Sequence, residues 1–326
     1  MSEVTSNVTL IVPTVHHRAE LFLQTLKYFS HLGWRGPIIV SDYSPQEHLG
    51  TISGLVNQHS DLNVGLRVDP PEAHFLARLA GCAQDARTDY VHLHADDDFL
   101  VFATLSHLHD FMESNPGCAA AMGVNIQLTV ASQGIAVLTK TGSSQPDPFN
   151  RLLSRLEKFS SVLYALRRRS EFIDSVFYAQ ARCPDVQFWQ YLETCQTVLS
   201  GTIAVMDHLH YVRKRHEKQW SNQLAQERSP DHFPHLILSP NFQPRVAAFG
   251  TALIDACTTR GIAVDHGALD DGLIRLLHRG FGAMGLPQRR TTEELVSGLD
   301  QIMKRIQDEN DPARQELVRI YQAIGA

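Results

Sequence analysis

The first hundred residues alternate short apolar runs with segments whose apolar residues recur at helical spacing. Between the first two runs, the segment 18–33 places Phe22, Leu26 and Phe29 on one helical face, and Gly33 follows where a helix typically ends. Strands that alternate with helices in this way predict a parallel sheet covered by helices. The apolar runs that we predict as its buried strands begin at Val8, Pro37, Leu62 and Asp89.

Polar residues gather at the points where these strands end. Because open α/β sheets bind their ligands at the carboxyl ends of the strands, this grouping predicts a single binding site. No GxGxxG follows the first strand and no GxxxxGK[ST] occurs, so neither dinucleotide binding nor a P-loop is indicated. The polar residues are Thr14, Asp42, Ser44, Asp69 and the run Asp96, Asp97 and Asp98.

The middle of the chain continues the α/β pattern as far as residue 222. A helix that begins near Asp185 and a strand that leads into the charged segment "RKRHEKQW" close this first domain, 1–222. Ahead of them the sequence predicts one helix, two strands and one flexible loop, at 102–116, 118–130, 134–140 and 141–150.

Beyond residue 222 the sequence changes character. A stretch rich in proline and polar residues, "QERSPDHFPHLILSPNFQP", is followed by helical patterns whose apolar stripes begin at Phe249, Leu269, Leu295 and Leu317. Amphipathic helices of this kind bury their apolar stripes against a neighbour. We therefore predict a C-terminal, mostly helical module at 223–326 that packs on the first domain.

The charge of the chain argues against one class of partner. A formal net charge of -6 and a pI near 6.3 provide no basic field for nucleic acid.

No stretch reaches the roughly 18 apolar residues that a membrane span requires, and the N-terminus lacks the basic region of a signal peptide. We therefore expect a cytoplasmic protein. For the basic run 167–169 we favour exposure to water over an anionic membrane surface, and peripheral membrane contact stays open.

The run Asp96–Asp98 is the strongest chemical signal in the sequence. Three adjacent carboxylates repel one another, which opposes the ionisation of all three unless a cation relieves the repulsion. Mg²⁺ and Mn²⁺ prefer oxygen ligands and usually take only one or two from the protein, while a bound diphosphate supplies others. The run therefore predicts a site for Mn²⁺ or Mg²⁺, and a solvated acidic turn or helix cap is the alternative.

Four blocks of the sequence resemble the GT-A glycosyltransferases of the family 2 type. In that family the blocks read approximately as a strand ending in P-T with a following helix, then "VVDDGS", "ARNxGLxxAxGEYIxFLDADD" and "YxxRxH". Here they are "VTLIVPTVHHRAELFLQTLKYF", "IIVSDYS", "ARLAGCAQDARTDYVHLHADDDFL" and "AVMDHLHYVRKRH", in the same order. The resemblance implies an α/β GT-A fold, a Rossmann-like mixed sheet flanked by helices, with the C-terminal helices as an appendage.

The resemblance implies a nucleotide site at the strand ends. Asp42 matches the second acidic residue of "DDGS" and would hydrogen-bond the base, while Arg78 would lie near the nucleotide or its phosphates. Thr14, in the P-T that ends the first strand, joins this nucleotide site. The alternatives are a turn-forming aspartate at Asp42 and an exposed helix arginine at Arg78.

The acidic run would be the DxD motif of the family, in one of two registers. One register uses Asp96 with Asp97 and the other uses Asp96 with Asp98, and Asp98 is our preferred direct metal ligand. His216, in "YVRKRH", occupies the place of a histidine that can close around the metal in the family, and a surface histidine is the alternative. His92 is predicted as a core or supporting residue rather than a ligand.

Two further residues complete the predicted chemistry. Arg213 could neutralise the departing diphosphate, because guanidinium groups suit phosphate oxygens. Asp185 matches part of the acidic pair from which the family takes the general base that deprotonates the acceptor hydroxyl, and a simple helix N-cap is the alternative. "SDYS" lacks the first acidic residue and the glycine of "DDGS", which indicates a divergent branch of the family.

These residues together predict a metal-dependent glycosyltransferase. It would move a sugar from a nucleotide-sugar donor to a glycan or other hydroxyl acceptor, in bacterial polysaccharide or glycoconjugate assembly. A nucleotidyltransferase of related fold is one alternative, although "PTVHHRAE" lacks the glycine-rich loop such enzymes use. The other alternative is a catalytically silent protein that binds a glycan or a nucleotide.

Overall fold

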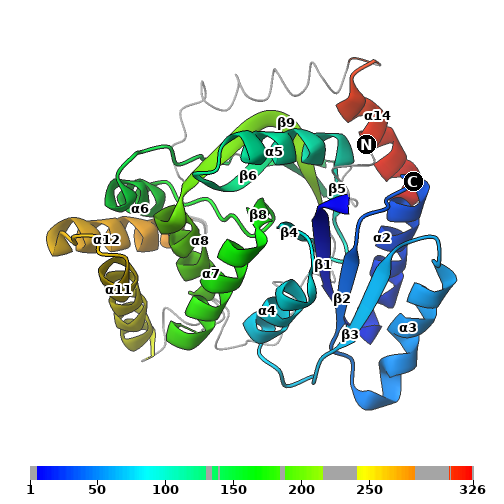
Figure 1. Cartoon of the computed structure of the whole chain (residues 1–326), viewed down its shortest axis with the longest axis horizontal. Coiled ribbons are helices and arrows are strands. Elements are labelled where there is room, and N and C mark those ends of the chain that lie inside the picture. Colours follow the sequence, from blue (N-terminus) through cyan, green and yellow to red (C-terminus); the bar gives the residue numbers. More distant parts are fainter. Residues whose placement is uncertain are drawn as a thin grey trace.

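A computed structural model describes residues 6–129, 134–138, 140–183, 188–215, 241–282, 308 and 310–324. Within these ranges the chain forms one mixed β-sheet with helices on both faces (Figure 1). The strand order is β3-β2-β1-β4-β8-β6-β9-β5, and β7 pairs with β6 outside this path. Among the described residues, no helix combines the length and the apolar character that crossing a membrane takes.

One half of the sheet is parallel. Its strands are β1 (Val8–Thr14), β2 (Ile38–Asp42), β3 (Val64–Val68) and β4 (Tyr90–Leu93). The register pairs Thr14 with Asp42 and Asp42 with Val68, while β1 pairs with β4 from Val8 opposite Tyr90. The carboxyl ends of these strands therefore meet along one edge of the sheet, as the sequence predicted.

The other half of the sheet is mostly antiparallel. β8 runs antiparallel to both β4 and β6, β5 runs antiparallel to β9, and β7 runs antiparallel to β6. The long strands β6 and β9 pair in parallel with shifts in register. The strands of this half are β5 (Phe99–Leu100), β6 (Cys118–Thr129), β7 (Gly134–Leu138), β8 (Leu166–Arg168) and β9 (Thr202–Arg215).

Two groups of helices bury the two faces of the sheet. On one face lie α2 (Ala19–His31), α3 (Leu49–Gln58), α5 (Phe102–Ser114) and α14 (Pro312–Ile324), with the short helices η1 (His16–Arg18) and η2 (Gln46–His48) at the strand ends. The helices that share the second hydrophobic core, on the other face, are α4 (Phe75–Asp85), α6 (Pro148–Glu157), α7 (Arg169–Arg182), α8 (Trp189–Ser200), α11 (Phe242–Thr259) and α12 (His266–Gly282).

The C-terminal helices lie against different parts of the sheet layer. α11 packs on α7 and α8, α12 packs on α6, and α14 packs on α2 at the opposite side of the molecule (Figure 1). The predicted boundary at residue 222 and the apolar stripe that begins at Leu295 both lie outside the described residues. The division into two domains therefore stays a prediction.

Most elements predicted from the apolar pattern are confirmed. Gly33 ends α2 with a φ of 67°, in the left-handed region that favours glycine. The predicted loop 141–150 is shorter than expected, because α6 begins at Pro148. Asp147 caps this helix by accepting a hydrogen bond from the Asn150 N–H at 2.8 Å. The apolar pattern did not reveal this start, which depends on a local cap and an N-terminal proline.

The expectation that the basic run 167–169 faces water is wrong for its first member. Arg167, on β8, has no exposed surface and forms an ion pair with the equally buried Glu193 of α8. Its Nη2 also donates hydrogen bonds to Ser175 Oγ at 2.8 Å and to Thr197 Oγ1 at 2.6 Å. The guanidinium therefore joins β8 to α7 and α8 inside the core, and β-strand alternation rather than solvation decides its position.

Replacing Glu193 with glutamine should strongly destabilise the fold. The change leaves the buried guanidinium of Arg167 without its closest charge partner, which typically costs about 3–5 kcal/mol in the free energy of unfolding. Urea denaturation followed by circular dichroism measures this cost. The matched control is Glu157→Gln, since Glu157 pairs with Arg275 at 3.5 Å at the surface and its loss should cost about 1 kcal/mol or less. Equal costs for the two variants would contradict the assignment.

Candidate functional site

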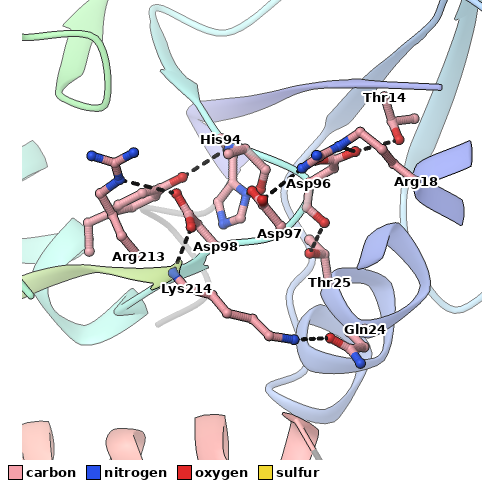
Figure 2. Close-up of polar contacts among 12 residues, drawn as sticks. Thr14, Arg18, Gln24, Thr25, His94, Asp96, Asp97, Asp98, Arg213 and Lys214 are labelled. Carbon is pink, nitrogen blue, oxygen red and sulfur yellow. Dashed lines mark hydrogen bonds and ion pairs between the residues drawn. The ribbon is translucent and has the colours of Figure 1, made fainter. Parts of the chain in front are cut away.

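The acidic run lies at the end of β4, where it contacts the end of β1. Thr14 Oγ1 donates a hydrogen bond to Asp96 Oδ2 at 2.7 Å, and Thr25 Oγ1 donates to the Asp96 carbonyl oxygen at 2.9 Å (Figure 2). All three aspartates are buried, with exposed fractions of 3%, 9% and 3% for Asp96, Asp97 and Asp98. The run is therefore buried and is not a solvated acidic turn.

Arg18 is the cation closest to Asp96 and Asp97 among the described residues. Its Nε lies 2.9 Å from both carboxylate oxygens of Asp96, and its Nη2 lies 2.6 Å from Asp96 Oδ1 and 2.7 Å from Asp97 Oδ2. Burial opposes the charged guanidinium, but the hydrogen bonds and charge of Asp96 prevail and raise the pKa of Arg18. Arg18 thus remains charged and bridges the two carboxylates.

Asp98 meets a different pair of basic residues. The antiparallel pairing of Phe99 with Val212 brings the end of β9 beside the acidic run. The backbone N–H of Lys214 donates a hydrogen bond to Asp98 Oδ1 at 2.9 Å, while Arg213 Nε lies 3.9 Å from Asp98 Oδ2, beyond hydrogen-bond distance (Figure 2). Burial, and then the charge of Asp97, raises the pKa of Asp98 above its usual range.

The chemistry of these carboxylates fits a divalent cation at Asp97 and Asp98. Both side chains offer carboxylate oxygens, which such cations prefer. The pKa of Asp98 is raised even though Arg213 lies 3.9 Å away, so a further positive charge nearby would favour its ionised form. Within the described part of the chain, no three His, Cys, Asp or Glu side chains group as a metal site, so substrate oxygens would have to complete the coordination. The predicted third ligand, His216, lies outside the described residues.

Asp42 lies at the end of β2, and one of its carboxylate oxygens is hydrogen-bonded within the chain. Asp42 Oδ1 accepts hydrogen bonds from the Ser44 N–H at 2.9 Å and from the Ser44 hydroxyl at 2.5 Å. The other oxygen, Oδ2, is buried and has no hydrogen-bond partner among the described residues. A buried acceptor without a partner is costly, which makes it a candidate contact for a ligand N–H group.

Arg78 offers complementary donors close to the same strand end. Its guanidinium lies over the ring of Tyr43, 3.7 Å from the ring centre, and its Nε and Nη1 are buried with no acceptor in the described chain. Burial raises the pKa of Tyr43, and the charges of Arg78, Asp96 and Arg18 also act on this phenol. Arg78 is therefore buried and is not an exposed helix arginine.

Two buried histidines lie on β4 and β9, the strands that also carry the site's acidic run and Arg213 at their ends. His92 on β4 and His210 on β9 have no exposed surface, and their ring centres lie 5.2 Å apart. Both ring nitrogens of His210 lack a hydrogen-bond partner among the described residues, and burial, with smaller effects of Lys140 and His94, lowers the pKa of His210 to about 3. The prediction that His92 belongs to the core agrees with this arrangement.

The structure brings most of the predicted site residues together. Thr14, Asp96, Asp97, Asp98 and Arg213 share one group of contacts. Asp42 pairs with Thr14 across β1 and β2, and Arg78 stacks on Tyr43, which follows Asp42. Asp185 and His216 lie outside the described residues, so their roles stay predictions. Sequence reasoning missed Arg18, although a basic residue just after β1 and an acidic run at the end of the neighbouring strand were together a sufficient signal.

Comparison with solved structures identifies the fold. The chain is similar to S. aureus TarS 1-349, with a TM-score of 0.51, 15% identity, and coverage of 98% of this chain and 81% of that one. The same TarS fragment in complex with UDP-GlcNAc gives a TM-score of 0.53 at 15% identity, over 91% of this chain and 81% of that one. The chain therefore has the GT-A glycosyltransferase fold, as predicted. No model of a protein family and no curated protein matches the sequence.

The buried His210 should make the fold sensitive to acid. The histidine stays neutral in the folded protein, whereas in the unfolded chain it takes up a proton below its ordinary pKa of about 6.5. Stability is therefore complete above pH 6.5 and falls as the pH drops toward 3, with a loss of about 2 kcal/mol between pH 8 and pH 5 from this residue alone.

Thermal and urea unfolding of the wild type and of His210→Leu at pH 8 and pH 5 would measure the effect. We expect the variant to lose about 2 kcal/mol less stability between the two pH values than the wild type. The control is His31→Leu, because His31 is exposed at the end of α2 and should leave the pH dependence unchanged. The same pH dependence in wild type and His210→Leu would contradict the burial of a neutral histidine at this position.

Proposed function

We propose that this chain is a glycosyltransferase that moves a sugar from a nucleotide-sugar donor to a hydroxyl acceptor. The observation that carries the proposal is the buried run Asp96–Asp98 at the carboxyl edge of the parallel strands, beside cationic side chains from both halves of the sheet. The GT-A fold supports the assignment, and TarS, which shares it, has been solved in complex with UDP-GlcNAc. A nucleotide sugar is therefore the donor class to test first.

The base of the donor would be recognised at the end of β2. Asp42 Oδ2 can accept a hydrogen bond from a base N–H, and the Nε and Nη1 groups of Arg78 can donate to a base carbonyl or a phosphate. These polar atoms are buried without partners among the described residues, so a ligand that pairs with them relieves an existing cost. The stacked pair of Arg78 and Tyr43 also fixes the orientation of the guanidinium.

The diphosphate of the donor would lie over the acidic run. Asp97 and Asp98 would hold Mn²⁺ or Mg²⁺, with Asp96 and the predicted ligand His216 completing the proposed set. A bound divalent cation supplies positive charge that stabilises the leaving diphosphate. Arg213 lies beside Asp98 and adds a guanidinium suited to phosphate oxygens.

The acceptor side of the reaction needs a general base. An acceptor hydroxyl loses its proton as its oxygen attacks the anomeric carbon, and Asp185 is our candidate for this role. It stands at 185 in the sequence, shortly before α8 (Trp189–Ser200), whose inner face belongs to the core next to the sheet. We place the acceptor among bacterial polysaccharides or glycoconjugates, and a cytoplasmic setting belongs to the same proposal.

Nucleotide binding should depend on Asp42 and on Asp98 in different ways. Calorimetry with UDP, GDP, ADP and CDP, each with and without Mn²⁺, should reveal one preferred nucleotide. Asp42→Asn should weaken its binding about tenfold or more with and without metal, because the base loses its acceptor. Asp98→Asn should instead remove the Mn²⁺ dependence of binding.

The matched control for both variants is Asp270→Asn, which removes the same charge from an exposed position on α12. This variant should bind the nucleotide as the wild type does. Hydrolysis of the matching nucleotide-sugar, followed by release of the nucleoside diphosphate, separates an enzyme from a silent binding protein. Failure of all four nucleotides to bind, with and without Mn²⁺, would overturn the proposed function.

A further inference from the structure

The guanidinium of Arg18 occupies the position where a metal ion would have to meet the carboxylates of Asp96 and Asp97. Its Nη2 lies 2.6 Å from Asp96 Oδ1 and 2.7 Å from Asp97 Oδ2, and its Nε lies 2.9 Å from Asp96 Oδ2 (Figure 2). Hydrogen bonds between charged groups at such distances are among the strongest in proteins. Arg18 therefore acts on this run as an internal cation.

The backbone around Arg18 fixes this placement. Arg18 ends η1, where its N–H donates to the Val15 carbonyl oxygen at 2.9 Å. The same short helix is tied to the end of β2, because the His16 N–H donates to Ser44 Oγ at 2.8 Å. The ring of His16 also stacks on that of His48, with ring centres 4.0 Å apart. The segment after β1 thus presents Arg18 to the acidic run from an anchored position.

A guanidinium and a divalent cation cannot share these oxygens without strong repulsion. At a few ångströms, two positive charges in a partly buried site oppose each other strongly, and each Asp oxygen bonded to Arg18 has lost an acceptor position. Asp98, the third member of the run, lies beside a different guanidinium, with its Oδ2 3.9 Å from Arg213 Nε.

We propose that Arg18 competes with the divalent cation for the acidic run and must leave Asp97 before the metal can bind there. The side chain of Arg18 is 13% exposed, so it lies at the rim of the buried run and has solvent on one side. Once displaced from Asp97, the guanidinium would be free to pair with the phosphates of a donor, whose oxygens suit its planar donors. In this proposal Arg18 is a positioning residue whose guanidinium exchanges a carboxylate partner for a phosphate partner. The inference rests on the proposed function in one respect, that the run takes a divalent cation.

Direct measurement of Mn²⁺ binding without nucleotide tests this competition. We expect Arg18→Gln to bind Mn²⁺ about tenfold or more tightly than the wild type, by calorimetry and by electron paramagnetic resonance of free Mn²⁺. Arg18→Lys keeps the charge but not the planar fork, so its affinity should lie between the two. The charge-matched control is Arg182→Gln, whose arginine pairs with Asp255 at the surface at 3.2 Å and should leave the affinity unchanged.

A second measurement guards against loss of structure in the variant. Arg18→Gln should melt below the wild type without metal, because its carboxylates lose their counter-ion, and Mn²⁺ should raise its melting temperature more than that of the wild type. Adding Asp97→Asn to Arg18→Gln should cancel the gain in affinity. If Arg18→Gln and Arg18→Lys stay folded and bind Mn²⁺ no more tightly than the wild type, the competition is refuted, while metal-linked nucleotide binding would still stand as a separate result. No Mn²⁺ binding by any form, with or without nucleotide, would refute both the inference and the metal site of the proposed function.

Discussion

Three carboxylates packed at the end of a buried strand impose the constraint around which the site is organised. Asp96, Asp97 and Asp98 cannot all carry charge in the interior unless cations or N–H groups lie close to them. The fold supplies these partners from two directions, with Arg18 after β1 and the end of β9 on the other side. The parallel register of β1 with β4 and the antiparallel pairing of β5 with β9 are what deliver them.

The same constraint recurs deeper in the sheet, where it is met differently. Arg167 is buried with Glu193, and the hydroxyl groups of Ser175 and Thr197 accept hydrogen bonds from its Nη2, so the chain itself supplies partners for this charge. His210 avoids the problem by staying neutral. Around the acidic run, Asp42 and Arg78 keep buried atoms that find no partner among the described residues. Other buried atoms of the chain also lack partners, and what sets Asp42 and Arg78 apart is their place at the strand ends beside the acidic run, where Asp42 pairs with Thr14 and Arg78 stacks on Tyr43.

The apolar pattern predicted the parallel strands and the edge at which the polar residues meet, because both follow from local periodicity and strand order. It could not predict that Arg167 is buried, because its ion pair with Glu193 joins residues far apart in the sequence. By composition alone, the run "RRR" indicates an exposed segment. Only the pairing of β8 with both β4 and β6 turns its first member, Arg167, toward the interior. The start of α6 was missed for the opposite reason, since a local cap at Asp147 acts over three residues.

The helix α14 forms hydrogen bonds with segments that lie close in the sequence to the acidic run. Glu316, on α14, is buried and accepts a hydrogen bond from the backbone N–H of Phe102 at 2.9 Å, at the start of α5. The Tyr28 hydroxyl of α2 lies within hydrogen-bond distance of both Glu316 Oε1 and the Leu100 carbonyl oxygen, at 3.1 and 2.9 Å. α2 follows directly after Arg18, and Leu100 follows closely after Asp98. The carboxylate of Glu316 therefore ties α2, which begins after Arg18, to the segment that follows Asp98.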